Sequence, residues 1–174
     1  MNKASLQPAR RRTANANIEP LDVLHRLLKL GNRLGAPFSE HLEKRHRVTM
    51  NEFRVIMLIG RLGKAASHEI AEISGVTTMS VSRAVTSLER KGRIACKVDP
   101  QNRRRKILRL TKEGERLYQK MLPTADNVAT YLFNSLQPEE VRAFDSIMAK
   151  LIDSLDARDA DGRSVFIEKT RPEN

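Results

Sequence analysis

The sequence contains a single cysteine, no tryptophan and few aromatic residues, and each shortage excludes a class of protein. Cys96 has no second cysteine with which to form a disulfide inside the chain, which favours a reducing compartment, the cytoplasm. Only 4% of the residues are aromatic, which disfavours a stacking platform for single-stranded nucleic acid or RNA. Because no apolar run approaches the roughly 20 residues of a membrane-spanning helix, no membrane partner is expected.

Positive charge, in contrast, is abundant. The 174 residues carry 32 Lys and Arg against 21 Asp and Glu, for a net charge of +11, and 40% of them are hydrophobic, which is enough for a buried core. The excess is concentrated, because residues 90–112 hold ten basic residues and one acidic residue, a net +9, whereas residues 113–174 carry a net −4. A concentrated positive segment indicates a partner with negative charge.

This basic segment has the pattern of a β-hairpin. Apolar residues alternate with others over residues 94–98 and again over 106–110, as in strands with one face on a core. Residues 99–102, Asp-Pro-Gln-Asn, suit a turn, with proline at its second position. Three arginines follow at the tip of the hairpin, where guanidinium groups can bind phosphates or enter a minor groove: Arg103, Arg104 and Arg105.

The rest of the chain is predicted to be mostly helical. Helices are expected over residues 21–47, from a Thr49–Glu52 capping box to residues 60–63, over 66–74, from Thr77 or Thr78 to Lys91, from Thr111 toward Leu136, and from Pro138 to Asp156. The second of these helices is expected to place on its core side Phe53, Ile56, Met57 and Leu58. The first is expected to kink or break at Gly31, Gly35 or Pro37, and Pro123 to bend or interrupt the fifth.

The helices expected at 66–74 and 78–91 form a helix-turn-helix pattern around Gly75. At 100° per residue, the second helix buries Val81, Ala84, Val85 and Leu88. The opposite side then holds Met79, Arg83, Thr86 and Arg90, flanked by Ser80 and Ser82. The candidate base-reading residues are Thr78, Met79, Ser80, Ser82, Arg83 and Thr86. Arg83 can pair with guanine through two hydrogen bonds, and Met79 can touch a thymine methyl group. Together with the basic hairpin, this pattern predicts a winged helix-turn-helix over about residues 49–112 that binds double-stranded DNA.

Three motifs in this order resemble the MarR family of bacterial regulators. They are Leu88–Gly92 at the close of the recognition helix, Asp99–Arg104 in the wing, with Gln101 and Asn102 where the family often has Arg and Asp, and Leu110–Gly114 after the wing. The resemblance covers about residues 21–156 and implies a mainly α fold with a small β-hairpin wing. It implies one domain over 21–156, with dimerisation helices at about 21–47 and 111–156. Residues 1–20 are then expected to be a disordered basic arm, and residues 157–174 a loose polar tail.

The same resemblance implies a homodimeric transcriptional regulator that responds to a small, commonly aromatic effector. It is expected to act as a repressor on a palindromic operator and to carry no cofactor. The wide apolar stripe of the last helix agrees with an interface. The candidate dimerisation residues are Leu21, Leu24, Leu28, Phe144, Ile147, Met148, Leu151, Ile152 and Leu155. A ligand-independent architectural DNA-binding protein is the alternative, and an interaction adaptor without DNA binding is disfavoured by the arginine cluster.

Other kinds of site find little support in the sequence. A phosphate loop, a nucleophile elbow and metal-ligand spacing are all lacking, so no enzyme is expected. His41 and His46 lie five residues apart, too far to share a helical face, and no metal site is expected. Cys96 alternates with Ile94 and Val98, which predicts a buried, unreactive thiol.

Overall fold

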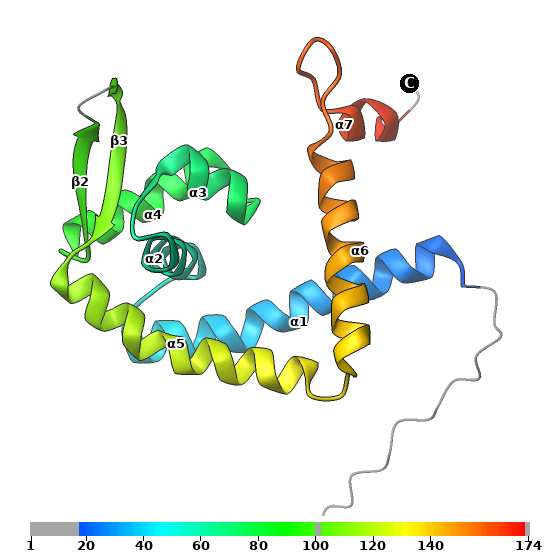
Figure 1. Cartoon of the computed structure of the whole chain (residues 1–174), viewed down its shortest axis with the longest axis horizontal. Coiled ribbons are helices and arrows are strands. Elements are labelled where there is room, and N and C mark those ends of the chain that lie inside the picture. The colour runs from blue at the N-terminus through cyan, green and yellow to red at the C-terminus, as the bar shows by residue number, and fades with distance from the viewer. Residues whose placement is uncertain (1–17, 100–101, 173–174) are drawn as a thin grey trace, which may run out of the picture. The chain divides into compact units, whose positions relative to one another are not determined.

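The computed structural model describes residues 18–99 and 102–172 (Figure 1). Residues 1–17, which hold most of the expected basic arm, lie outside the described residues, as do Pro100 and Gln101 of the wing turn and the side chains of residues 99 and 102–105. The chain forms two compact units, divided between Leu117 and Tyr118, and each unit is described by itself. Among the helices of the described residues, none is long and apolar enough to cross a membrane.

The first unit begins with a long helix, α1 (Pro20–His46). Of the kink or break expected near Gly31, Gly35 and Pro37, the break is wrong, because helical structure continues through all three residues. Glycine and proline weaken a helix locally, but a helix of 27 residues has hydrogen-bonded turns on both sides that carry it across such positions. The helix ends at Arg47, whose φ of 51° is left-handed and whose backbone N–H donates to the carbonyl oxygen of Glu43.

Helix α2 (Met50–Leu62) begins with the predicted capping box. The Thr49 hydroxyl accepts from the Glu52 N–H at 3.3 Å, and the Glu52 carboxylate accepts from the Thr49 N–H at 2.8 Å. The expected core side is partly wrong: Ile56 is buried, whereas Phe53, Met57 and Leu58 are only half-buried. The buried face instead passes through Glu52, Val55, Ile56 and Ile59. A charged residue on the core side hid this face from a pattern that counts apolar residues.

The helix-turn-helix is formed by α3 (Ser67–Ser74) and α4 (Thr78–Arg90). Gly75 joins them with a φ of 64°, a conformation that is unstrained for glycine. The side chain of Thr77 caps α4 by accepting from the Ser80 N–H. All four residues expected in the buried stripe of α4 are buried: Val81, Ala84, Val85 and Leu88. The predicted helix-turn-helix is therefore confirmed.

A three-stranded antiparallel sheet completes this part of the chain, in the order β1-β3-β2. The predicted hairpin is confirmed as β2 (Ile94–Asp99) and β3 (Asn102–Leu110), in which Cys96 lies opposite Leu108. The sequence did not reveal β1 (Ala65–Ala66), a two-residue strand that pairs with Leu108 and Ile107 of β3. The expected fold class, mainly α with a small β-hairpin wing, is thus confirmed.

Helix α5 (Lys112–Phe133) starts in the first unit and continues into the second. The side chain of Thr111 caps it by accepting from the Gly114 N–H at 3.1 Å. Pro123 was expected to bend or interrupt α5, and it lies inside the helix without interrupting it. Helix α6 (Pro138–Asp156) has the predicted bounds, and the rings of Phe133 and Phe144 lie 6.3 Å apart.

The tail beyond α6 is ordered, contrary to the expectation of a loose segment. Asp159 accepts hydrogen bonds from the backbone N–H groups of Asp161 and Arg163, and Ser164 caps a short helix, α7 (Val165–Thr170). Local side-chain to backbone hydrogen bonds of this kind order a polar segment without a core, and amino-acid composition does not register them.

Candidate nucleic-acid interface

The outward face of α4 carries the side chains expected to read DNA. Met79 is 65% exposed, and Ser82, Arg83 and Thr86 are exposed as well, together with Thr78 near the start of the helix. Ser80 is half-buried, and its hydroxyl accepts a hydrogen bond from the capping Thr77 hydroxyl at 3.0 Å. Five of the six expected residues therefore lie exposed on one helix, above a core that the same helix completes from its other side.

Met79 and Arg83 are joined on this face. The Arg83 Nη2 lies 3.5 Å from the Met79 sulphur, a contact between side chains one helical turn apart. Sulphur is a weak acceptor, so the contact orients the guanidinium without holding it firmly. The two side chains that bear a cation and a methyl group thus project together from the exposed surface of α4.

The wing grows more exposed from its base to its tip. At the base, Ile94 and Leu108 are buried, whereas Val98, near the tip, is 55% exposed. The register shifts between Val98 and Asp99, which marks an irregularity just before the turn. The backbone of the three wing arginines runs in β3, and their side chains belong to the part of the chain that is not described. The structure therefore places the arginine run at the tip of a projecting hairpin.

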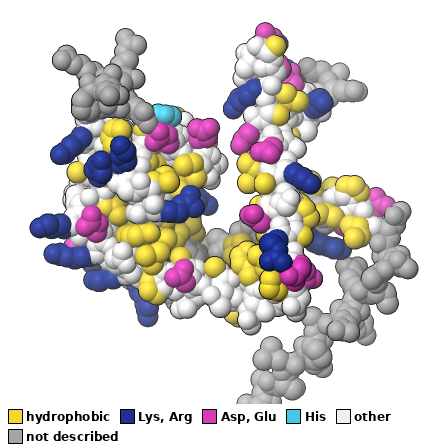
Figure 2. Space-filling model, viewed as in Figure 1, with side chains coloured by type: hydrophobic (Ala, Val, Ile, Leu, Met, Phe, Trp, Pro, Cys, Tyr) yellow, Lys and Arg dark blue, Asp and Glu magenta, His cyan; other side chains and the backbone are white. Residues whose placement is uncertain are grey.

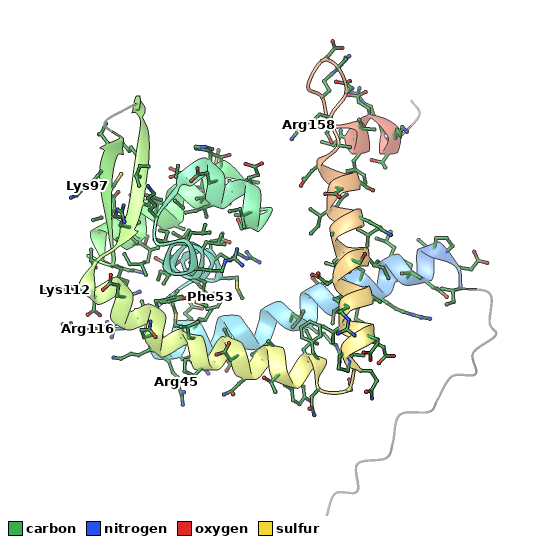
Figure 3. The ribbon with its side chains drawn as sticks, viewed as in Figure 1. Arg45, Phe53, Lys97, Lys112, Arg116 and Arg158 are labelled. Atoms are coloured by element: carbon green, nitrogen blue, oxygen red, sulfur yellow. The ribbon has the colours of Figure 1, made fainter. Side chains whose placement is uncertain are left out.

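Further basic side chains line the outer edge of the first unit. Figure 2 shows Lys and Arg gathered along the edge that holds the hairpin and the start of α5. Lys97 of β2 and Lys112 and Arg116 of α5 point outward from this edge (Figure 3). All three are exposed, and Arg116 pairs with Glu113 at 3.3 Å. The concentrated charge of residues 90–112 thus becomes a surface beside the wing.

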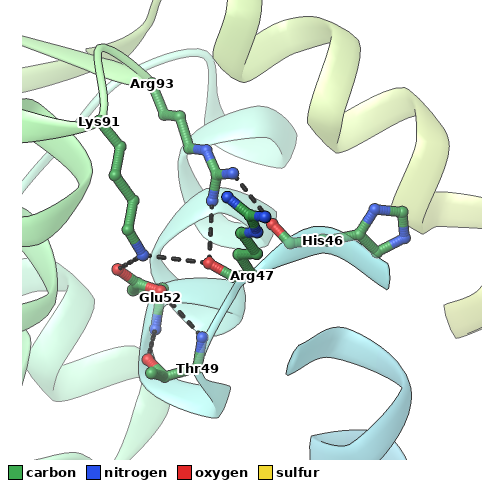
Figure 4. A network of polar contacts seen from close by, with 6 residues as sticks. All are labelled: His46, Arg47, Thr49, Glu52, Lys91 and Arg93. Atoms are coloured by element: carbon green, nitrogen blue, oxygen red, sulfur yellow. Dashed lines mark hydrogen bonds and ion pairs between the residues drawn. The ribbon is translucent and has the colours of Figure 1, made fainter. Parts of the chain in front are cut away.

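Two cations of the basic segment, Lys91 and Arg93, are bound by polar groups of the protein itself (Figure 4). Lys91 Nζ lies 2.7 Å from Glu52 Oε1 and 3.0 Å from the carbonyl oxygen of Arg47. The Arg93 guanidinium donates to the carbonyl oxygens of Arg47 and His46, at 3.3 and 2.9 Å. This network is not evident from the sequence, in which Lys91 and Arg93 count with the charge available to a partner. The one signal was Glu52, an acidic residue at a core position of α2.

Glu52 is the buried acid of this network, with 1% of its surface exposed. Burial alone would raise the pKa of its carboxyl group. Hydrogen bonds from Lys91, from Ser87 and from the Thr49 N–H, with the positive charge of Lys91, outweigh burial and hold the pKa below its ordinary value. The carboxylate is therefore ionised at neutral pH, and the ion pair with Lys91 is intact.

Cys96 is the one cysteine of the chain. Cys96 is half-buried, so the prediction of a buried thiol was too strong. Burial and the nearby charge of Glu89, partly offset by Lys106, raise the pKa of the thiol, which leaves little reactive thiolate at neutral pH. The described part of the chain contains no cluster of three or more His, Cys, Asp or Glu side chains that could hold a metal ion.

Each unit also has an apolar surface of its own. Leu21, Leu24 and Leu28 of α1 are exposed in the first unit. In the second unit, none of the described side chains of α6 is buried, although the helix is rich in large apolar residues. Those of the candidate dimerisation set lie between one third and just over one half exposed, except the half-buried Met148: Phe144, Ile147, Leu151, Ile152 and Leu155.

Comparison with known proteins decides the family. The model of the MarR family matches residues 48–106, which span α2 to β3. An HTH-type transcriptional regulator of Bacillus cereus is 30% identical over 127 residues, covering 72% of this chain and 84% of its own length. The chain belongs to the MarR family. As a MarR-family protein it is a transcriptional regulator and not an enzyme.

Solved structures of MarR-type regulators have the same fold. The MarR/EmrR family transcriptional regulator from Acinetobacter sp. ADP1 superposes with a TM-score of 0.72 at 23% identity, over 78% of this chain and 96% of its own. The S. aureus MepR–DNA complex has a TM-score of 0.66 at 24% identity, over 79% and 99%. Bordetella bronchiseptica BpsR, whose DNA binding is regulated by 6-hydroxynicotinic acid, has a TM-score of 0.65 at 23% identity, over 75% and 98%.

Proposed function

We propose that this MarR-family regulator is a cytoplasmic homodimer that represses transcription by binding a palindromic operator, and that a small aromatic acid releases it. The observation that carries the proposal is the exposed face of α4, where Arg83 and Met79 project beside hydroxyl side chains from a helix whose opposite face is fully buried. Short hydroxyl residues are poor helix formers, so their concentration on an exposed helix favours a binding role.

In this proposal, α4 enters the major groove and the wing contacts the backbone. Arg83 pairs with O6 and N7 of a guanine, Met79 packs on a thymine methyl group, and Thr78, Ser80, Ser82 and Thr86 bind neighbouring bases or phosphates. Arg103, Arg104 and Arg105 reach phosphates or the adjacent minor groove. The exposed Lys97 and Lys112 extend the positive field beside the wing.

The apolar surfaces of α1 and α6 support the dimer. Large apolar side chains that stay exposed along a whole helix are typical of an interface that resembles a core cut in half. A twofold dimer presents two copies of α4, whose half-sites lie about one helical turn, roughly 34–36 Å, apart.

Effector control is proposed from the neighbours. BpsR is regulated by 6-hydroxynicotinic acid, and NadR has been solved with 4-hydroxyphenylacetate. Both molecules are small aromatic acids. We therefore propose an effector of this chemical class, which is tested by screening small aromatic acids for release of duplex DNA from the full-length protein.

Footprinting on the promoter of the protein's own gene tests the central claim. A regulator protects a palindrome whose half-sites lie one turn apart, and added protein lowers transcription from that promoter in a purified system. The alternative, an architectural protein that uses the same wing, binds any duplex with uniform affinity. Uniform affinity would therefore reject the proposed regulator.

Two single-residue variants distinguish base recognition by α4 from phosphate binding by the wing. Arg83→Ala is expected to relax base preference at one position, at a cost of about 1–3 kcal/mol for the preferred duplex. Arg104→Ala is expected to weaken all duplexes alike and to reduce the salt dependence of binding by about one phosphate contact. Identical behaviour of the two variants across a set of operator mutants would contradict this division of roles.

A further inference from the structure

The network around Glu52 takes two cations away from the charge available to DNA. Lys91 and Arg93 belong to the basic segment that ends in the wing, yet their side chains bind Glu52 and the carbonyl oxygens of His46 and Arg47 (Figure 4). Lys91 Nζ would have to leave a carboxylate at 2.7 Å and a carbonyl at 3.0 Å in order to reach a phosphate.

The Glu52 carboxylate and the carbonyl groups at the end of α1 both need these cations as hydrogen-bond donors. Glu52 is buried, so losing Lys91 would leave a carboxylate in the interior without its counter-charge. The last carbonyl groups of a helix have no partner inside the helix, and those at the end of α1 are satisfied by Lys91 and Arg93. Lys91 therefore binds the end of α1 and the start of α2 at the same time, and Arg93 binds the end of α1.

The backbone of the same segment is bonded to a third helix. The Arg93 carbonyl oxygen accepts from the Thr111 N–H at 3.1 Å, and the Gly92 carbonyl oxygen accepts from the Thr111 hydroxyl at 2.7 Å. A Cβ placed on Gly114 would lie 1.9 Å from the Arg93 carbonyl oxygen, so the start of α5 is pressed against this segment. Residues 91–93 thus link α4 to β2 and are tied to the ends of α1, α2 and α5.

We propose that Lys91 and Arg93 are positioning residues for DNA binding, which hold the recognition helix and the wing in register and do not contact phosphate. The assignment rests on the proposed function. The segment connects the two elements that must meet DNA together, so a shift at residues 91–93 changes their relative position. The positive charge of residues 90–112 therefore has two roles. The arginines of the wing contact DNA, and the cations of residues 91–93 bind groups of the protein itself.

The test removes one positive charge from each kind of position. Lys91→Gln and Arg93→Gln are compared with Arg104→Gln in the full-length protein, across a salt series. The probes are a duplex that the wild-type protein selects from a random pool and an unselected duplex of equal length. Arg104→Gln is expected to weaken both duplexes and to lower the slope of log affinity against log salt by about one.

Lys91→Gln and Arg93→Gln are expected to keep the wild-type salt slope. They weaken the selected duplex by about tenfold, the equivalent of one lost base contact, and leave the unselected duplex almost unchanged. A slope lowered as in Arg104→Gln would overturn the assignment, because it would show a phosphate contact. An unchanged affinity for the selected duplex would also overturn the assignment, because it would show that Lys91 and Arg93 do not position the recognition helix and the wing.

A folding control and the wild-type protein complete the test. Lys91→Gln leaves Glu52 unpaired, so the double variant Glu52→Gln/Lys91→Gln, which has no lone buried charge, is measured beside it and is expected to keep the wild-type salt slope. Circular dichroism checks that each variant is folded. If the wild-type protein binds no duplex, the proposed function is rejected. If the wild-type protein binds and Lys91→Gln lowers the slope of log affinity against log salt, only the positioning role is rejected.

Discussion

Helices α4 and α6 each carry an apolar stripe, yet the stripe of α4 is buried and that of α6 is exposed. In α4, Val81 and Leu88 are 2% and 0% exposed. In α6, Leu151 and Ile152 are 46% and 50% exposed. The sequence pattern of the two helices is the same, with apolar residues three and four apart.

The difference lies in what surrounds each helix. The apolar face of α4 is covered by α2, α3 and the sheet, all from the same unit. The described residues of the second unit supply no core for α6. Periodicity therefore tells which face of a helix is apolar, whereas the partner that covers this face has to come from tertiary or quaternary structure.

The largest effect is expected from truncating the buried stripe. Leu88→Ala removes a fully buried side chain from α4 and should lower the free energy of unfolding by about 2–5 kcal/mol, through lost burial and the cavity left behind. Urea unfolding measures the loss, which should not depend on protein concentration. Leu151→Ala on α6 is the matched control: if it costs as much in dilute protein, the contrast between the two helices is wrong.

A charge on the apolar face of α6 is expected to break the proposed dimer. Leu151→Glu would place an unpaired carboxylate in the interface and raise the dissociation constant about 100-fold or more. Sedimentation equilibrium measures the shift. Ala149→Glu adds the same charge on the opposite side of the same helix and should leave the dimer intact. Equal effects of both changes, or none from either, would argue against an interface on this face.

The features of the fold that the sequence predicts correctly are those that depend on local sequence and not on tertiary partners. Thr49, Gly75, Thr77 and Pro138 marked helix starts and the turn correctly, because caps and left-handed glycines act locally. Of the bend or interruption expected at Pro123, the interruption is wrong, because a helix stabilised over many turns accommodates a proline that would end a short one. Only part of the candidate site could be predicted from the sequence. A helical wheel places Arg83 on the side of α4 away from the core. The contact of Lys91 with Glu52 could not be predicted, because it joins residues 39 positions apart in the sequence.

Gly114→Ala is expected to disturb the junction between the wing and α5. The added Cβ would lie 1.9 Å from the Arg93 carbonyl oxygen, so the backbone must shift, at a cost of about 3 kcal/mol. Thermal unfolding measures the loss. Gly31→Ala, in α1 with open space around the new methyl group, should be neutral or slightly stabilising. A stable Gly114→Ala variant would show that this junction tolerates movement.

Glu52→Gln is expected to cost about 2 kcal/mol at neutral pH, since it removes a hydrogen bond between charged groups. The pKa of Glu52 is lower in the folded protein than in the unfolded chain, so its contribution is present above the ordinary carboxyl pKa and is lost as the pH falls through the lowered value. The difference in unfolding free energy between wild type and variant should therefore shrink in acid. A difference that stays constant down to low pH would mean that the ionised carboxylate contributes nothing.

The smallest effect is expected from an ion pair of α6, and it separates distance from burial. Arg142 Nη2 lies 2.6 Å from Glu139 Oε1, as close as Lys91 lies to Glu52, but both side chains of the α6 pair are about 70% exposed. Water screens such a pair, so a double-mutant cycle with alanine at both positions should give a coupling energy of about 0.3 kcal/mol. The same cycle on Glu52 and Lys91 should give a coupling several times larger, because the Glu52 side chain is 2% exposed. Equal couplings would mean that the two regions differ in their apolar packing alone and not in the environment they give to charge.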